Sequence, residues 1–507
     1  MAAATRLAAT GLEQEEVVVS AGALGRQAFW DLERWLCSGK SAGLALQQIE
    51  IEEERRGREM LRLLLQAHIN ARGYGDVGAA LRVAGPDGSC KDVLYTHKRP
   101  HRRRLITILG RIFITRVGYG RPGASSVHPL DAQLQLPARA YSYEVQRRLI
   151  KATLQGPFDE ARDALADATG VVVPKRSAEQ LVIDAAVDFD AFYDQRRSCC
   201  QKHDGPILVG SVDCKGIPMV KAEGAERKVR LGKGEKRHKK RMATVATVFT
   251  QQPNIRTLEE VVASLFATTE DAHRQQPRQF SRPERKRVWA SLLAPKQTFI
   301  ADVREEMRRR DRRHRKTWVV VTDGERALQR LVGTLLKDVL YLLDLLHVLE
   351  KLWAASYVFH PEGSPEAEAF VRERTLRILR GGVSQVVKGF RQMVTKRGFR
   401  GQNRKTLLDT ARYFYRNRQR MRYQEYLRNG LPIASGSVEG ACKNLIKDRM
   451  ERSGIRWTPA MAEAMLRLRA AYLSGDFDAY WGYHVRQEQV RLHSHQRWHP
   501  VLAVVPK

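Results

Sequence analysis

Cysteines are scarce in this sequence, and those present follow no structural pattern. Six occur in 507 residues, and none forms a C-x-x-C pair. The adjacent Cys199 and Cys200 suit neither an ordinary disulfide nor a zinc site, because both need side chains that converge in a defined geometry. We therefore expect reduced thiols, which are typical of an intracellular protein.

Long apolar segments are also missing. The longest, from Val339 to Trp353, is interrupted by Asp344, His347 and Glu350. It is shorter than the roughly 20 residues that a helix needs to cross a bilayer. The N-terminal segment MAAATRLAATGLEQEE has no basic stretch followed by an apolar block, so no secretory signal is predicted. No coiled-coil heptad and no repeat of solenoid spacing occurs.

What the sequence has in excess is positive charge. Lys and Arg number 88 against 56 Asp and Glu, which gives a formal net charge of +32. This balance predicts a polyanionic partner, with nucleic acid favoured because no long basic amphipathic stretch for a membrane surface stands apart. The hydrophobic fraction of 43% excludes a wholly disordered chain, and the length allows about three or four domains.

The first 200 residues alternate between helical and strand patterns. Helical spacing of apolar residues runs to about residue 75, and RRLITILGRIFITRVGYG predicts a hairpin around Gly110-Arg111. Three helical pieces follow over 141–197, with the dimensions of a helix-turn-helix. Many helical trios bind nothing, so this region and the first helices remain alternative DNA-reading elements.

Beyond residue 203 the pattern is that of a mixed α/β layer. PILVGSVDCKG, IPMVK and RMATVATVFTQ predict three strands, and TWVVVTDGERALQRLV and VLYLLDLLHVLEKLW predict two strand-to-helix passages. The region 351–430 is helical and very basic. PIASGSVEGACKNLIKDRM then opens a helix with Ser435 or Ser437 as N-cap.

Three carboxylates occupy positions where chemistry is expected. Asp213 and Asp323 end apolar strands, where open α/β sheets present functional side chains, and Glu439 lies in the first turn of a helix. Converging carboxylates repel one another unless cations lie between them, which suggests two Mg²⁺ ions. The alternative is that both aspartates only end strands and cap helices.

The segments SVDCKG, VTDGERAL, LLDLLHVLEKLW and PIASGSVEGACKNLIKDRMERSGIRW resemble the DDE transposases of bacterial insertion sequences, specifically the ISKra-type group. The resemblance covers most of the chain and is most specific in the last motif. It implies a ribonuclease H-like mixed α/β catalytic core with an all-α insertion and a mainly helical N-terminal DNA-binding region. The expected divisions are an N-terminal helical region (1–95), a β-hairpin (96–125), a helix-turn-helix-like DNA-binding region (126–202), the first part of the core (203–350), the insertion (351–430), the final core helix (431–475) and a tail (476–507).

The resemblance also implies roles for single residues. Asp213, Asp323 and Glu439 correspond to the catalytic acids and would bind two Mg²⁺ ions, with Mn²⁺ as a substitute. Asp344 and His347 resemble the D-x-x-H motif of Mutator-like transposases and would support the site, unless His347 only begins a helix.

Basic residues near these motifs are expected to contact DNA. The four-residue spacing of Glu439, Lys443 and Lys447 predicts one helix face that carries a phosphate track, against the alternative of an ordinary solvated Glu–Lys pair. Trp457 would stack on an unpaired base or pack in the core. The full expected set is Lys443, Lys447, Arg449, Arg452, Trp457, Lys233, Arg237, Lys239, Lys240 and Arg241.

The function that the resemblance implies is binding of an element's terminal inverted repeats, metal-dependent cleavage and strand transfer into target DNA. A homodimer or larger assembly on paired ends is expected, in the cytoplasm and associated with the bacterial nucleoid. Two alternatives stay open: a catalytically inactive DNA-binding protein derived from a transposase, and a ribonuclease H-like nuclease that does not join ends.

Overall fold

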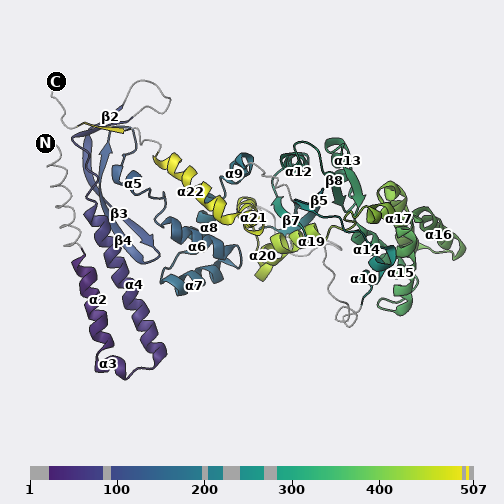
Figure 1. The fold of residues 1–507 in the computed structure, drawn as a ribbon, viewed down its shortest axis with the longest axis horizontal. Coiled ribbons are helices and arrows are strands. Elements are labelled where there is room, and N and C mark those ends of the chain that lie inside the picture. The colour runs from purple at the N-terminus through teal and green to yellow at the C-terminus, as the bar shows by residue number, and fades with distance from the viewer. Residues whose placement is uncertain are drawn as a thin grey trace, which may run out of the picture. The chain divides into compact units, whose positions relative to one another are not determined.

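The computed structural model describes residues 22–83, 93–196, 204–220, 240–267, 282–493 and 498–501. The chain forms two compact units, one from Met1–Asp188 with Asp478–Lys507 and the other from Phe189–Phe477 (Figure 1). Each unit has its own sheets and helices, and each is considered by itself.

The first unit begins with helices and a long hairpin. Helices α2 (Ala23–Leu36), α3 (Gly39–Ala42) and α4 (Leu46–Ala71) precede strands β1 (Ala80–Val83) and β2 (Val93–Tyr95), which join β10 (Trp498–Val501) in the order β10-β1-β2. Strands β3 (His97–Thr107) and β4 (Gly110–Gly120) pair antiparallel. The side-chain amide of Gln66 on α4 bonds the backbone N–H and C=O of Phe113 at 2.8 and 2.7 Å. These two bonds fasten α4 to the hairpin.

Short helices complete this unit, and breaks in the sequence pattern separate them. They are α5 (Pro129–Gln133), α6 (Tyr143–Thr153), α7 (Phe158–Thr169), α8 (Lys175–Ala185) and all but the first residue of α22 (Phe477–His493). Gly170 ends α7 with φ of 68°, a left-handed conformation that glycine adopts without strain. Arg491 and His484 on α22 each donate to the buried Asp188 carboxylate at 2.7 Å. The last helix is therefore tied to the end of the α6–α8 region.

His128 makes the stability of this unit sensitive to acid. Burial and the guanidinium of Arg116 lower the pKa of His128 to about 4. The unfolded chain, with a pKa near 6.5, then binds more protons than the folded chain. The free energy of unfolding is therefore highest above pH 6.5 and falls as the pH drops from 6.5 through 4, by on the order of 2 kcal/mol once the partial exposure of the ring is discounted. We expect urea unfolding midpoints to fall more steeply with acid for wild type than for His128→Gln, and parallel curves would refute this.

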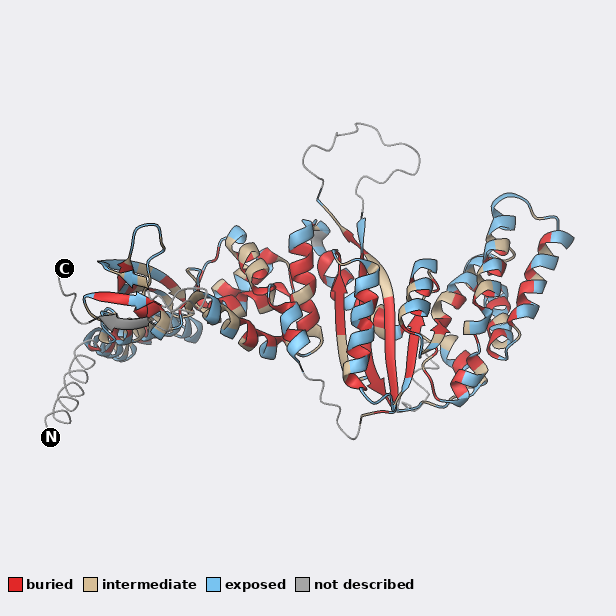
Figure 2. Ribbon diagram, turned by 90° about the horizontal axis from the view of Figure 1, so that it is seen from above, coloured by how far each residue is buried: buried red, intermediate tan, exposed pale blue. Residues whose placement is uncertain are grey.

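The second unit is built on a mixed five-stranded sheet, as the sequence pattern predicts. Its strands are β5 (Ile207–Pro218), β6 (Lys240–Gln251), β7 (Glu284–Ser291), β8 (Thr317–Thr322) and β9 (Leu340–Leu343), in the order β7-β6-β5-β8-β9. Strands β5, β6 and β7 pair antiparallel, whereas β8 pairs parallel with both β5 and β9. Figure 2 shows these strands mostly in the colour of buried residues.

Two details of the sheet differ from the sequence prediction. The expected separate strand at IPMVK does not form, because Ile217 and Pro218 continue β5. Strand β7 was not predicted, because its sequence ERKRVWAS opens with charged residues and only its last four residues are buried. Pairing with β6, a tertiary effect, makes this segment a strand.

Helices surround the sheet and make up most of the remainder of this unit. They are α9 (Phe189–Gln195), α10 (Leu258–Leu265), α12 (Lys296–Arg310), α13 (Arg326–Leu335), α14 (Leu345–Ser356), α15 (Pro365–Leu379), α16 (Val383–Lys396), α17 (Gly401–Asn417), α18 (Tyr423–Arg428), α19 (Gly436–Ala441), α20 (Asp448–Met450) and α21 (Pro459–Leu473). One hydrophobic core runs from Val319 on β8 through Leu352 on α14 to Phe390 and Phe414 on α16 and α17. Within the described residues, no helix is long and apolar enough to span a membrane.

Candidate active site

Three aspartates lie at matching positions on the three parallel neighbours β5, β8 and β9. Val212 on β5 pairs with Thr322 on β8, and Thr322 pairs with Leu343 on β9. The next residue on each chain segment is an aspartate: Asp213, Asp323 and Asp344. In-register residues of parallel neighbours project to the same face of a sheet. Because the apolar strands β5, β8 and β9 pair in this register, the three aspartate carboxylates lie at one edge of the sheet.

Glu439 joins this edge from a distant part of the sequence. Among the described residues, one group of three could hold a metal ion, formed by Asp344, His347 and Glu439, whose candidate ligand atoms lie within 4.8 Å of one another. Burial and the carboxylates of Asp344 and Asp213 raise the pKa of Glu439. Burial is also the main cause that raises the pKa of Asp323, to which the Asp213 carboxylate contributes. The three expected acids and the D-x-x-H residues thus share one electrostatic environment.

The Asp344 carboxylate is fully occupied by hydrogen bonds. Its Oδ1 accepts the backbone N–H groups of Leu346 at 2.9 Å and Ser435 at 3.2 Å. Its Oδ2 accepts the Ser435 hydroxyl and lies 3.1 Å from His347 Nδ1. Asp344 has no exposed surface. Since a carboxylate offers about four lone-pair sites, Asp344 serves better to position other residues than to bind an ion directly.

Ser435 was expected only as an N-cap, and the structure uses it differently. It precedes α19 but makes no side-chain capping bond. Its hydroxyl instead bonds Asp344, which joins the short helix that carries Glu439 to the start of α14. No local pattern in the sequence predicts this contact, because the two residues lie 91 positions apart.

His347 is held by the same carboxylate. The hydrogen bond that the His347 ring donates to the Asp344 carboxylate, more than any other cause, raises the pKa of His347 to about 9. With Nδ1 directed at Asp344, Nε2 is the ring nitrogen left for a ligand, as in carboxylate–histidine–metal arrangements. The positive charge of the His347 imidazolium partly offsets the negative charge of the carboxylates around it.

Asp213 and Asp323 retain more free lone pairs than Asp344. The Asp213 carboxylate accepts the Cys214 N–H at 2.6 Å and the Cys442 thiol at 3.3 Å. The Asp323 carboxylate accepts the Glu325 N–H at 2.9 Å. Both can still offer oxygens to a cation, and their catalytic role stays a prediction. The Cys442 contact, which sequence reasoning missed, links the end of α19 to β5.

The expected DNA-contact residues divide by exposure. Lys443, Lys447, Arg452, Lys240 and Arg241 are exposed, and Lys240 forms an ion pair with Glu451 at 2.6 Å. Lys233, Arg237 and Lys239 lie outside the described residues. The segment Cys442–Lys447 is a π-helix, which has more residues per turn than an α-helix. The four-residue spacing therefore does not place Glu439, Lys443 and Lys447 on the one helix face that the sequence predicts.

Two members of that set lie in the core. Trp457 is 2% exposed and donates its indole N–H to the Met450 carbonyl at 2.8 Å. Arg449 has no exposed surface, and its guanidinium lies 5.0 Å from the centre of the Trp457 ring. For Trp457 the geometry matches the core alternative, since a buried indole has no face open to a base.

Comparisons with known proteins assign no family. No protein-family model matches the chain, and no curated protein does. Among solved structures, the Drosophila P element transposase strand transfer complex is similar over 68% of this chain and 83% of that chain, with 11% identity and a TM-score of 0.25. A similarity of this extent assigns neither the fold nor the activity.

Proposed function

We propose that this protein is a DDE transposase that binds the ends of an insertion sequence and catalyses metal-dependent DNA cleavage and strand transfer. The observation that carries the proposal is the sheet edge to which the strand register brings Asp213, Asp323 and Asp344, and at which candidate ligand atoms of Glu439, His347 and Asp344 lie within 4.8 Å of one another. The strand order supports it: three antiparallel strands followed by two parallel ones is the arrangement expected of a ribonuclease H-like core.

The donor set fits hard divalent cations. Carboxylate oxygens are the ligands that Mg²⁺ prefers, and Mn²⁺ accepts the same set. We assign Asp213, Asp323 and Glu439 as the ligands and His347 as a supporting group, with Asp344 positioning it. The raised pKa values of Asp323 and Glu439 show that ionising both is unfavourable without added positive charge. Divalent cations here would lower the pKa of an attacking hydroxyl and stabilise the leaving oxygen.

The protein's own part in the reaction is positioning. Lys443, Lys447 and Arg452 are exposed and follow Glu439 in the chain, and we assign them to contacts with DNA phosphates. Water first cuts at the element end and frees a 3′-hydroxyl, which then attacks a target phosphodiester. One phosphodiester replaces another, so no ATP is needed. Two ends must react together, which suits a homodimer or a larger assembly.

The test uses purified protein with Mg²⁺ and labelled DNA from the two ends that flank its reading frame, which are expected to be inverted repeats. Cut ends and joined products are the expected result. Shifted but uncut DNA would support the inactive DNA-binding alternative. Cutting without joined products would instead support a ribonuclease H-like nuclease, which shares the same acidic edge.

A further inference from the structure

A basic groove lies at the end of the sheet opposite the acids. It has a volume of about 610 Å³ and is lined by the C-terminal half of α12, by Trp318 at the start of β8, and by Asp338 before β9. At the other end of α12, Lys296 pairs with Glu325, two residues beyond Asp323, at 2.8 Å. Helix α12 has 15 residues, which span about 22 Å at 1.5 Å per residue. The groove is therefore separate from the candidate active site.

Three arginines form one stripe in this groove. Arg304 and Arg308 lie one turn apart on α12, and Arg312 follows at the same spacing just beyond its end. All three are exposed. None forms an ion pair with a carboxylate among the residues that the structure describes, and we call them the arginine stripe.

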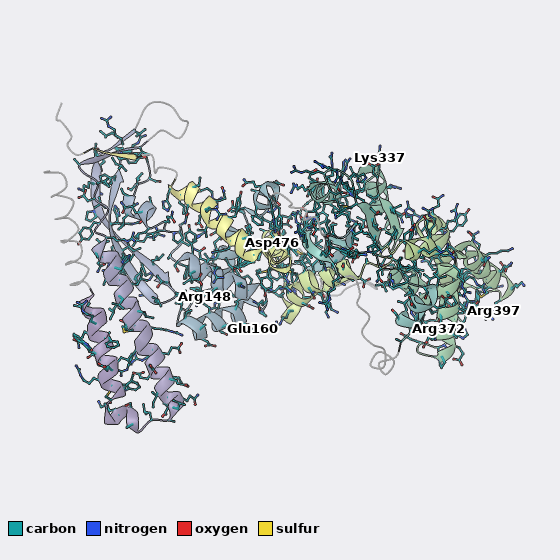
Figure 3. All side chains as sticks on the ribbon, in the orientation of Figure 1. Arg148, Glu160, Lys337, Arg372, Arg397 and Asp476 are labelled. Carbon is teal, nitrogen blue, oxygen red and sulfur yellow. The ribbon has the colours of Figure 1, made fainter. Side chains whose placement is uncertain are left out.

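The acids of the groove are largely engaged elsewhere. The buried Asp311 carboxylate accepts the backbone N–H groups of Arg315 and Lys316 at 2.9 and 2.8 Å and the Trp318 indole N–H at 3.0 Å. Glu305 lies 3.7 Å from Arg309. Asp338 is exposed. Its neighbours in the chain are Lys337 and Val339, and the Lys337 ammonium group is a cation beside the Asp338 carboxylate in the sequence (Figure 3). The arginine stripe therefore faces solvent without a direct ion pair to either exposed acid of the groove among the described residues.

We propose that the arginine stripe binds the phosphate backbone of a duplex DNA segment other than the one at the acidic edge. This inference rests on the proposed function for its partner class. Arg304 and Arg308 are about 6 Å apart along the axis of α12, and Arg312 lies beyond the helix end but lines the same groove, so the three guanidinium groups can engage neighbouring phosphates. Of the two aromatic rings in the groove, Trp318 is 8% exposed with its N–H committed to Asp311, and the exposed His314 ring packs edge-on against Trp318 at 4.6 Å between ring centres. Single-strand sites stack successive bases on several exposed rings, and this groove exposes a single imidazole among three arginines, so the geometry favours duplex.

The test compares two triple variants in EDTA, where no metal-dependent cutting interferes. The first is Arg304→Gln, Arg308→Gln and Arg312→Gln. The control is Lys388→Gln, Lys396→Gln and Arg404→Gln, which removes three exposed cations of α16 and α17. Binding to a 40-bp duplex of arbitrary sequence is measured over a salt series, with circular dichroism to verify folding.

We expect the stripe variant to bind at least about 100-fold more weakly near 0.1 M salt, with a salt slope shallower by roughly 2–3, because each lost phosphate contact removes about 0.9 from the slope. The control variant should change less than twofold. Equal losses in both variants, or a loss seen for single strands but not for duplex, would overturn the proposal. Because nothing is cut in EDTA, this result is independent of whether the cleavage test succeeds.

Discussion

Asp323→Asn is expected to abolish Mg²⁺-dependent cleavage and joining while DNA binding survives. The substitution keeps the shape of the side chain but removes the negative charge that favours a cation beside Asp213. We expect a loss on the order of 10³-fold or more in the cleavage rate, equivalent to about 4 kcal/mol of barrier. The measurement is the single-turnover rate on labelled element ends, with binding measured separately in EDTA.

Asp213→Asn and Glu439→Gln should behave alike, because the three acids would act as one ligand set. Glu350→Gln is the matched control. Glu350 is an exposed carboxylate on α14, and it adds to the negative potential at both His347 and Glu439 without belonging to the set. If Glu350→Gln impaired cleavage as strongly, the loss would come from the reduced negative charge of the whole region and not from the loss of a metal ligand. If any of the three acid variants kept full activity, the assignment of that residue would be wrong.

Asp344→Ala is expected to cost about 3–5 kcal/mol of unfolding free energy and to eliminate activity. The change leaves the Ser435 hydroxyl, two backbone N–H groups and the His347 ring without their shared buried acceptor. The pKa of His347 should fall from about 9 toward its ordinary value, because the Asp344 hydrogen bond is the largest cause of its rise. Urea unfolding and an NMR titration of the His347 ring provide the two measurements.

Ser435→Ala separates positioning from direct metal binding. If Asp344 positions α19, removing the Ser435 hydroxyl should lower the cleavage rate at saturating Mg²⁺ with only about 1 kcal/mol of destabilisation. If Asp344 is instead a metal ligand, Ser435→Ala should leave the rate unchanged, and Asp344→Asn should lower the cleavage rate as strongly as Asp323→Asn. A stability loss below 1 kcal/mol for Asp344→Ala would contradict the hydrogen-bond network itself.

The geometry of Glu439 depends on contacts at both ends of its helix. Helix α19 has six residues, too few to be stable alone, and a π-helix follows it. Ser435 joins its start to Asp344, and Cys442 joins its end to Asp213. Asp344, which follows β9, and Asp213, which lies inside β5 just past its parallel pairing with β8, therefore also place the last acid of the site.

The residue pattern alone determined most of the local elements, and it identified Asp213 and Asp323, although β5 continues past Asp213 to Pro218. Apolar runs that stop at Asp213 and Asp323, and helical spacing through 351–430, are local signals, because burial of a strand or helix requires its own period. Tertiary structure decided the rest: β7, the burial of Arg449 and Trp457, and the bonds of Ser435 and Cys442 to aspartates far away in sequence. Such contacts depend on which segments the whole core brings together, and no short stretch of sequence contains that information.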